Sequence, residues 1–392
     1  MSLACLILVT HLLGAGHLTR AAALGRALAQ AGHRVTLVSG GRPIALARTD
    51  GLTFVQLPPV QAALGDWSTL RDEAGAPASP ELLARRRDLV GAIAERMRPD
   101  IVVTELYPFG RRGLAAEFEA LLAAAISLRP RPLVATSVRD VLATPRKARR
   151  AEETEAALAR LYDLVLVHGD PELVPLEASW PVGPACAARL RYTGYIDADP
   201  PSPDMSASDE PGGAVLVTGG SSAAALPLYR AALAAAARAA AGSRSSPPWH
   251  ILVGHGVPEP DVTALRAASF GHARIERARP DFRALLRKSA VFVGQAGYNT
   301  VMDLFDSGAR AVLVPFEAGG ETEQRLRAER LAARGLARLL PEAELDGDRL
   351  AREVEAALAA SAPAWGGVDR DGARASARIL ENEALLRRAA RA

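Results

Sequence analysis

Short apolar runs alternate with longer segments of helical periodicity, and this alternation limits the fold more than any other feature of the sequence. Nine runs have the length of β-strands: residues 6–10, 34–39, 100–104, 132–136, 164–168, 214–218, 250–253, 291–294 and 311–315. Strands separated by helices need crossover connections, which pair the strands in parallel. We therefore expect an α/β protein built from doubly wound parallel sheets.

One segment interrupts this alternation. Residues 201–213 (PSPDMSASDEPGG) concentrate Pro, Ser, Asp and Gly, which is the composition of a linker. A chain of 392 residues also fits two domains better than one large core. We predict an N-terminal Rossmann-like domain over 1–200 and a C-terminal Rossmann-like domain over 214–375. A final helix over 376–392 is expected to pack back on the first domain.

Charge, cysteine content and hydropathy exclude several classes. A net charge of +3 does not indicate a nucleic-acid partner. Cys5 and Cys186 are the only cysteines, so the sequence predicts neither a disulfide framework nor a thiolate metal site. No apolar run reaches the 18 or so residues of a membrane span, and the first run lacks the flanks of a signal peptide. We expect a cytoplasmic protein.

The first strand leads into a glycine-rich loop, residues 10–20 (THLLGAGHLTR), and then into a helix. Gly14 and Gly16 let the backbone approach a ligand, and the helix start offers free N–H groups to an anion. The third glycine of a dinucleotide fingerprint is missing, and the second strand ends without an acidic residue for a ribose. NAD is therefore disfavoured as a cofactor.

His17 stands where this loop becomes helix. An imidazole with a pKa near neutrality suits removal of a proton from an acceptor hydroxyl. A histidine that caps or packs against the first helical turn would occupy the same position, and the position alone leaves both interpretations open. His11, closer to the strand, is a weaker candidate, and His168 at a strand end is expected to be structural.

Loops of the second half carry candidate ligand groups of their own. Gly219 and Ser221 follow a strand and precede a helix, which predicts a second anion site. Residues 294–300 (GQAGYNT) repeat the arrangement, with amides and a hydroxyl that suit a diphosphate. Asp303 suits ribose hydroxyls, although an acidic residue near a helix start is favourable in any protein. Glu323 and Gln324 suit sugar hydroxyls.

Three segments, 294–303 (GQAGYNTVMD), 312–316 (VLVPF) and 323–328 (EQRLRA), resemble in order and spacing the donor-site signature of MurG-type, family 28-like glycosyltransferases. The loop at 14–17 is similar to a shortened form of that family's N-terminal glycine-rich motif. The resemblance implies a GT-B architecture, with two Rossmann-like domains around a cleft. It also implies an acceptor on the first domain and a uridine diphosphate sugar on the second.

The resemblance further implies roles for individual residues. His17 is the base or the residue that positions the acceptor. Asp303 takes a ribose role that the family usually gives to Glu, and Glu323 stands where the family often has a second amide. The backbone near Arg279 reads the base. The donor set comprises Gly219, Ser221, Arg279, Gly297, Tyr298, Asn299, Thr300, Asp303, Glu323 and Gln324, and the acceptor set comprises Gly14, Gly16 and Glu105.

No metal and no cofactor beyond the sugar donor is expected. Asp197 and Asp199 form an Asp-x-Asp pattern, but they lie at the linker, away from the proposed diphosphate loops. Helix N-termini can neutralise a departing diphosphate without a cation.

The sequence thus predicts an inverting glycosyltransferase that moves a hexose-type sugar from a UDP-linked donor to an acceptor hydroxyl. A nucleotide-sugar 2-epimerase or hydrolase, and a non-catalytic nucleotide-sugar-binding subunit, remain as alternatives. Residues 60–90, with Trp67 and the Arg85-Arg86-Arg87 run, are the expected acceptor region. The acceptor is left open among a lipid-linked sugar, a glycan and a secondary metabolite, and the same region would allow peripheral contact with the inner face of a membrane.

Overall fold

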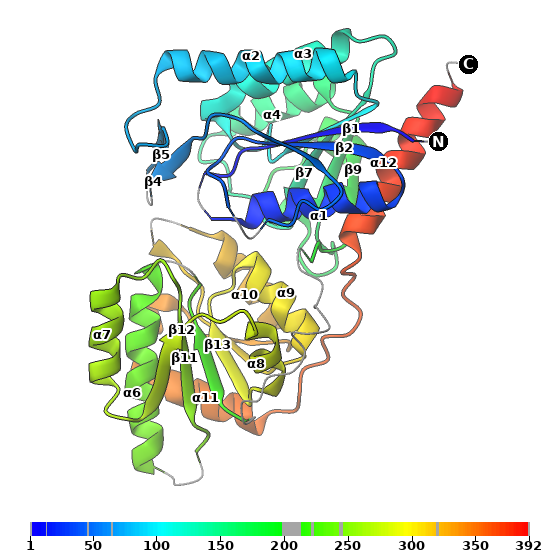
Figure 1. Ribbon diagram of the computed structural model, residues 1–392. Coiled ribbons are helices and arrows are strands. Elements are labelled where there is room, and N and C mark those ends of the chain that lie inside the picture. The colour runs from blue at the N-terminus through cyan, green and yellow to red at the C-terminus, as the bar shows by residue number, and fades with distance from the viewer. Residues whose placement is uncertain are drawn as a thin grey trace. The chain divides into compact units, whose positions relative to one another are not determined.

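The chain forms two compact units in the computed structural model, Met1–Asp199 with Asp369–Ala392, and Pro200–Val368 (Figure 1). The structure describes residues 2–12, 14–44, 47–63, 66–197, 213–220, 223–242, 246–318 and 321–390. The linker expected at 201–213 lies outside these residues except for Gly213. Each unit is an α/β structure around a parallel sheet, as the sequence predicts.

The first unit contains a seven-stranded parallel sheet in the order β3-β2-β1-β6-β7-β8-β9. The strands are β1 (Ala4–Val9), β2 (Arg34–Ser39), β3 (Thr53–Gln56), β6 (Ile101–Glu105), β7 (Leu133–Arg139), β8 (Leu164–His168) and β9 (Leu190–Tyr192). Strand order reverses between β1 and β6, and loops at the carboxyl ends of strands beside such a switch point are where ligands bind in open α/β sheets.

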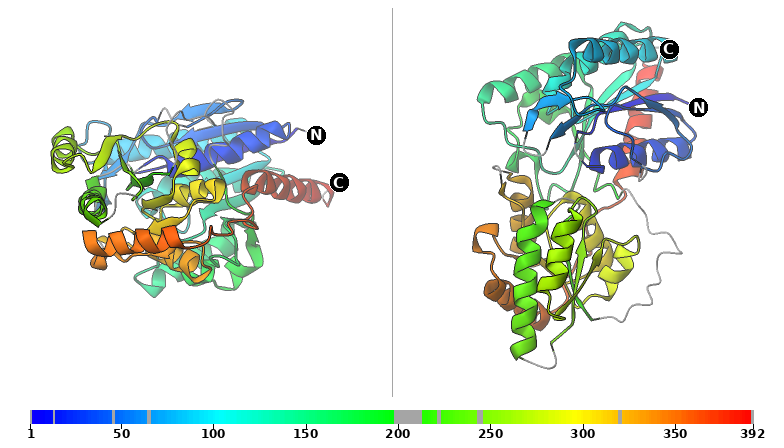
Figure 2. Two further views of the ribbon diagram at one scale, coloured as in Figure 1. Left: turned by 90° about the horizontal axis from the view of Figure 1, so that it is seen from below. Right: turned by 60° about the vertical axis from the view of Figure 1, so that its left-hand side comes forward.

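Helices cover both faces of this sheet. On one face, α1 (Gly16–Gln30) and α12 (Gly372–Ala389) lie side by side (Figure 1; Figure 2, right), and they share an apolar cluster with β1. On the other face pack α2 (Pro80–Met97), α3 (Ala115–Ser127) and α4 (Ala148–Leu161). A short α5 (Pro184–Arg189) precedes β9. The two-sided cover explains why β1 reads as one unbroken apolar run.

Local sequence signals set where some of these helices begin. Ser79 caps α2 by accepting a hydrogen bond from the Leu82 backbone N–H, and Pro80 occupies the first helical position. The segment 60–90 contains this helix start and a small antiparallel hairpin, β4 (Gln61–Ala63) and β5 (Asp66–Arg71).

The second unit contains a six-stranded parallel sheet in the order β12-β11-β10-β13-β14-β15. The strands are β10 (Val215–Thr218), β11 (Trp249–Val253), β12 (Ala273–Arg277), β13 (Val291–Gly294), β14 (Ala311–Leu313) and β15 (Arg338–Leu339). The helices are α6 (Leu226–Gly242), α7 (Glu259–Ala268), α8 (Phe282–Lys288), α9 (Tyr298–Ser307), α10 (Glu323–Ala333) and α11 (Gly347–Ala359). Helices α6 and α11 pack together on one face of the sheet (Figure 1).

The boundaries differ slightly from the sequence expectation. The second unit ends at Val368, and the last helix begins at Gly372. Among the described residues, no helix combines the length and the apolar character that a membrane span requires.

Candidate active site

His17 lies in the first turn of α1, and its ring contacts the carboxylate that ends β6. The His17 Nδ1 atom is 2.9 Å from Glu105 Oε1. Strand β6 is hydrogen-bonded to β1, the strand that leads into the His17 loop, so the sheet itself brings together two residues 88 positions apart. Glu105, expected on the acceptor side, is 2% exposed and lies against the imidazole.

Arg20, one helical turn after His17, contacts the same carboxylate oxygen through its NH2 group. That nitrogen is also 3.0 Å from His17 Nδ1. Arg20 can only donate and Glu105 can only accept, so Nδ1 would need a lone pair for Arg20 and a proton for Glu105. The Arg20 NH2 group already donates to Glu105, so we assign the Nδ1 proton to the Glu105 contact. This assignment leaves the Nε2 lone pair of His17 available to accept a proton.

Burial and charge shift both ionisable groups of this pair. Burial lowers the pKa of His17 to about 3, with help from the positive charges of Arg111 and Arg20, although Glu105 opposes the shift. Burial alone would raise the pKa of Glu105, but Arg20, His17 and Ser137 outweigh it and hold that pKa well below its usual range. The imidazole expected to titrate near neutrality is therefore a neutral ring beside an ionised carboxylate.

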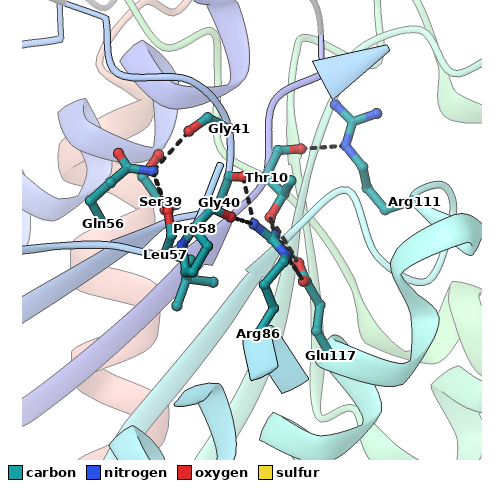
Figure 3. A network of polar contacts seen from close by, with 10 residues as sticks. All are labelled: Thr10, Ser39, Gly40, Gly41, Gln56, Leu57, Pro58, Arg86, Arg111 and Glu117. Atoms are coloured by element: carbon teal, nitrogen blue, oxygen red, sulfur yellow. Dashed lines mark hydrogen bonds and ion pairs between the residues drawn. The ribbon is translucent and has the colours of Figure 1, made fainter. Parts of the chain in front are cut away.

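Arg111, in the loop after β6, adds a second cation to this site. Its Nε donates to the Thr10 carbonyl oxygen at 2.6 Å, while its terminal nitrogens point away from Thr10 (Figure 3). Burial lowers the pKa of Arg111 to about 10, and Arg139 and Arg20 add to the shift against the opposing charge of Glu105. The guanidinium remains charged near neutral pH.

A buried ion pair supports the neighbouring loops (Figure 3). Arg86 of α2 is fully buried, and its guanidinium pairs with Glu117 of α3 through Nε at 2.9 Å and NH2 at 2.8 Å. The same guanidinium donates to the carbonyl of Gly40 at 2.9 Å and to that of Pro58. Arg86 therefore holds the chain just after β2 and β3 and is not available for acceptor or membrane contact, whereas Arg85 and Arg87 are exposed.

In the second unit, Gly297 precedes the first turn of α9, whose leading N–H groups have no partner within the helix. A Cβ placed on Gly297 would find only Thr300 Oγ1 within 4 Å, at 3.8 Å, so the backbone here is open. The Gly219 amide, by contrast, already donates to the Tyr229 hydroxyl at 3.1 Å. Ser221 lies outside the described residues.

Charged residues of the expected donor set have partners within the second unit. Asp303 accepts a hydrogen bond from Arg283 Nε at 2.7 Å. Arg279 pairs with Asp281 at 2.7 Å and with Glu276 at 3.2 Å, so its guanidinium is already engaged within the unit.

Glu323 and Gln324, at the start of α10, differ in what they face. Glu323 is 6% exposed and pairs at 2.9 Å with Arg327, whose NH1 donates to the Ala296 carbonyl at 2.7 Å. Through Arg327, the Glu323 carboxylate therefore supports the loop before α9. Gln324 Oε1 accepts from the Phe316 N–H at 3.1 Å, and the Gln324 side-chain NH2 has no hydrogen-bond partner among the described residues.

The sequence patterns did not single out several residues of the first-unit site. Arg20 and Ser137 were missed because a charge inside an alanine-rich helix and a hydroxyl within a strand give no distinctive signal. Thr193 lies in a segment, 192–195 (YTGY), that is typical of MurG-like sequences, but that resemblance gave it no role. Asp197 is described and Asp199 is not. Within the described ranges, no group of three or more His, Cys, Asp or Glu side chains could hold a metal ion.

Residues 214–363 match the family model of the glycosyltransferase family 28 C-terminal domain. Two curated relatives, from Nitrosococcus oceani and Aromatoleum aromaticum, are UDP-N-acetylglucosamine–N-acetylmuramyl-(pentapeptide) pyrophosphoryl-undecaprenol N-acetylglucosamine transferases. They are 39% identical over 107 residues and 35% identical over 108 residues. The matches cover 27% and 26% of this chain, and the chain spans only 29% and 30% of the length of these relatives.

Solved structures match over nearly the whole chain. The glycotransferase of kitacinnamycin has a TM-score of 0.64 at 19% identity and covers 99% of both chains. The spinosyn rhamnosyltransferase SpnG has a TM-score of 0.57 at 20% identity, covering 98% of this chain and 96% of its own. MurG of Acinetobacter baumannii has a TM-score of 0.57 at 16% identity, covering 96% and 98%. At these identities the likeness shows the fold, which is GT-B.

Proposed function

Because this chain carries a glycosyltransferase family 28 C-terminal domain and has the GT-B fold, we propose that it is an inverting, metal-independent glycosyltransferase. It moves a hexose-type sugar from a UDP-linked donor to an acceptor hydroxyl. The His17–Glu105 contact at 2.9 Å carries this proposal, because it places an oriented neutral imidazole at the carboxyl end of the first sheet.

In this mechanism, His17 Nε2 accepts the proton of the acceptor hydroxyl. An imidazole with a pKa of about 3 is a weak base, so it takes the proton only as the hydroxyl oxygen bonds to the anomeric carbon and becomes acidic. The imidazolium that forms then faces the Glu105 carboxylate, which stabilises the new charge. Burial, with the charges of Arg111 and Arg20, lowers the pKa of His17 and keeps the ring neutral until that step.

On the donor side, the first turn of α9 binds the diphosphate. Its free N–H groups and helix dipole favour the negative charge that builds up on the diphosphate as the bond to the anomeric carbon breaks. Asp303 contacts the ribose while it also holds Arg283, and the free NH2 group of Gln324 contacts the sugar. We assign Glu323 a supporting role through Arg327, because its carboxylate is buried in that ion pair.

UDP is the proposed donor nucleotide, with uracil as its base, because the curated relatives that match this chain use a UDP-linked sugar. Two of the solved structures, SpnG and SsfS6, are complexes with thymidine diphosphate, so a TDP-linked sugar is the competing donor. The acceptor carries a free hydroxyl and binds the first unit near Gly14 and Gly16. We propose a cytoplasmic enzyme, and any peripheral membrane contact would use exposed Arg85 and Arg87 rather than Arg86.

Nucleotide release tests the proposal. The purified chain is incubated with UDP-N-acetylglucosamine, UDP-glucose or TDP-glucose, each with and without a lipid-linked muramyl peptide analogue, spinosyn aglycone or a simple phenol. Release of UDP that requires an acceptor, with inversion at the anomeric carbon by NMR, supports transfer. Release without an acceptor would indicate a hydrolase, conversion of the donor to another nucleotide sugar would indicate an epimerase, and binding without turnover would indicate a sugar-nucleotide sensor.

A further inference from the structure

Ser137 and His168 form a buried polar connection behind Glu105 that the proposed mechanism does not use. Ser137 Oγ lies 2.5 Å from Glu105 Oε2 and 2.8 Å from His168 Nε2. His168 Nδ1 lies 2.9 Å from Thr193 Oγ1. The four side chains, all 2% exposed or less, follow the sheet order, because Glu105 ends β6, Ser137 is in β7, His168 ends β8 and Thr193 follows β9.

The direction of the Ser137 hydrogen bond follows from the chemistry of its neighbour. Glu105 is ionised against Arg20, and a carboxylate only accepts. An Oγ–Oε2 separation of 2.5 Å without a proton between the atoms would oppose two lone pairs. The Ser137 hydroxyl proton therefore points at Glu105, and Ser137 Oγ must accept from His168 Nε2–H.

This direction sets the tautomer of His168. A neutral ring with its proton on Nε2 has an acceptor at Nδ1, so the 2.9 Å contact with Thr193 Oγ1 needs the Thr193 hydroxyl proton. Thr193 Oγ1 also lies 2.9 Å from the Gly194 carbonyl and 3.3 Å from the Val167 carbonyl, and these two oxygens compete with Nδ1 for its one proton. Burial, aided by the charge of Arg20, lowers the pKa of His168 to about 3, although Glu105 opposes the shift. The ring is therefore neutral.

We propose that Thr193, His168 and Ser137 form a one-directional hydrogen-bond chain that orients the Glu105 carboxylate and thereby keeps the His17 proton on Nδ1. They are positioning residues, and no proton moves along the chain. The chain requires His17 and His168 to hold opposite tautomers, one on each side of the same carboxylate–serine pair. The role of the three positioning residues in turnover rests on the proposed function. The tautomers of His17 and His168 do not depend on that function.

The charged groups that act on His17 come from three elements. Arg20 belongs to α1, Glu105 ends β6 and Arg111 lies in the loop after β6. Arg20 and Glu105 also act on His168. None of these groups is changed by a substitution at Ser137, so a response of His17 to that substitution reports the hydrogen-bond chain.

Nitrogen NMR of the imidazole rings tests the tautomers in the parent protein without any substrate. The full chain is labelled with ¹⁵N-histidine, and its seven histidines are assigned with single His→Gln variants. We expect His17 protonated at Nδ1 only and His168 at Nε2 only at pH 7.5. A cationic His168, a His168 proton on Nδ1 or a His17 proton on Nε2 would overturn the proposed chain.

A Ser137→Ala variant tests the coupling. It removes one donor from Glu105, which makes the carboxylate a stronger acceptor, and we expect the His17 pKa to rise by at least half a unit. The same change frees the carboxylate to turn, so the His17 ring is no longer held in one orientation and turnover should fall although the ring is more basic. Thr136→Val is the matched control, because Thr136 is equally buried in the same strand but donates its hydroxyl proton to the Tyr107 carbonyl at 2.7 Å. Ser137→Thr keeps a hydroxyl and should restore the parent titration.

Kinetics separate this proposal from the proposed function. Ser137→Ala should lower kcat about tenfold with the donor KM unchanged, and Ser137→Thr should recover it. Unchanged His17 titration and kcat in folded Ser137→Ala would overturn the chain. If Ser137→Ala does not fold, Thr193→Val serves instead, and an unchanged His168 spectrum in that variant would overturn it. The expected tautomers in a protein that transfers no sugar would leave the chain standing and the proposed function wrong.

Discussion

Arg86 and Glu117 form a bidentate ion pair in the interior of the first unit, with side chains 0% and 3% exposed. The pair joins α2 to α3, and Arg86 carries it on to the carbonyls of Gly40 and Pro58. Each of these two buried charges is stabilised by the other, because either one alone would be an uncompensated charge in the protein interior.

Removing one member of this pair should destabilise the protein strongly. We expect Arg86→Met to lower the free energy of unfolding by about 3–5 kcal/mol. The double variant Arg86→Met/Glu117→Gln should lose less than the sum of the single changes. Arg87→Met, at an exposed neighbouring position, should stay within about 0.5 kcal/mol of the parent. Urea unfolding measures all of these, and equal losses for Arg86→Met and Arg87→Met would contradict the account.

His17 should matter for turnover and not for donor binding. As a general base it contributes about 10²–10⁴-fold, so His17→Ala should lower kcat by that factor with little change in donor affinity. If His17 only positions the acceptor, His17→Gln should keep much of the activity, because the amide still forms hydrogen bonds but takes no proton. Steady-state kinetics and donor titration measure the two quantities, and full activity in His17→Ala would eliminate both roles.

The two glycines near α9 should respond differently to a side chain. Gly297→Val should fold, because nothing but Thr300 Oγ1 lies within 4 Å of the added Cβ, but it should block the diphosphate and weaken UDP binding. Gly294→Val should unfold the unit, because its Cβ would lie 2.7 Å from the Thr218 carbonyl oxygen. Thermal unfolding and UDP calorimetry are the measurements. UDP affinity that is unchanged in folded Gly297→Val would remove the diphosphate assignment.

Asp303 and Asp306 offer a matched comparison one turn apart on α9. Both pair with an arginine of α8, Asp303 with Arg283 and Asp306 with Arg287. Asp303→Ala should weaken UDP binding by about 1–3 kcal/mol, because it leaves a ribose hydroxyl unpaired, and Asp306→Ala should not. Calorimetry with UDP and 2′-deoxy-UDP tests the contact. Equal affinity of the parent for both nucleotides would count against it.

Stability should fall as the pH falls below about 6.5. In the unfolded chain, histidines take up a proton near that pH, whereas burial lowers the pKa of His17 and His168 to about 3 in the folded protein. Between these values the unfolded state binds more protons, which favours unfolding. Urea unfolding at pH 7.5 and 5.0 should show this loss, and His168→Gln should reduce it. An identical pH dependence in parent and variant would be inconsistent with a neutral buried His168.

The strands that the sequence revealed are those buried on both faces. The run that became β1 is apolar throughout, and those that became β6 and β8 begin with three and four apolar residues and are fully buried, so their positions could be predicted closely. β9 and β15 have only three and two residues and are partly exposed, so no apolar run marks them. Their existence depends on a neighbouring strand edge that only the assembled sheet provides.

The candidate site also combines residues that the sequence marks with contacts that only the assembled sheet provides. His17 could be selected from the sequence for its glycine-rich loop, and Glu105 was included in the acceptor set that the family resemblance implies. Their contact could not be predicted, because it depends on β1 and β6 being neighbours in the sheet. Ser137 sits in the strand LVATSVR, where a hydroxyl gives no sign of which group it meets.

Because α12 packs on the first unit, it affects the order in which the two units can finish folding during synthesis. Ala377, Leu380 and Ala384 of that helix belong to the same apolar cluster as Leu3 and Leu24. A ribosome releases the whole second unit before it releases those side chains, and domains generally fold as units during synthesis. The earliest-made part of the chain must therefore wait, with one apolar face uncovered, while a later-made part folds to completion.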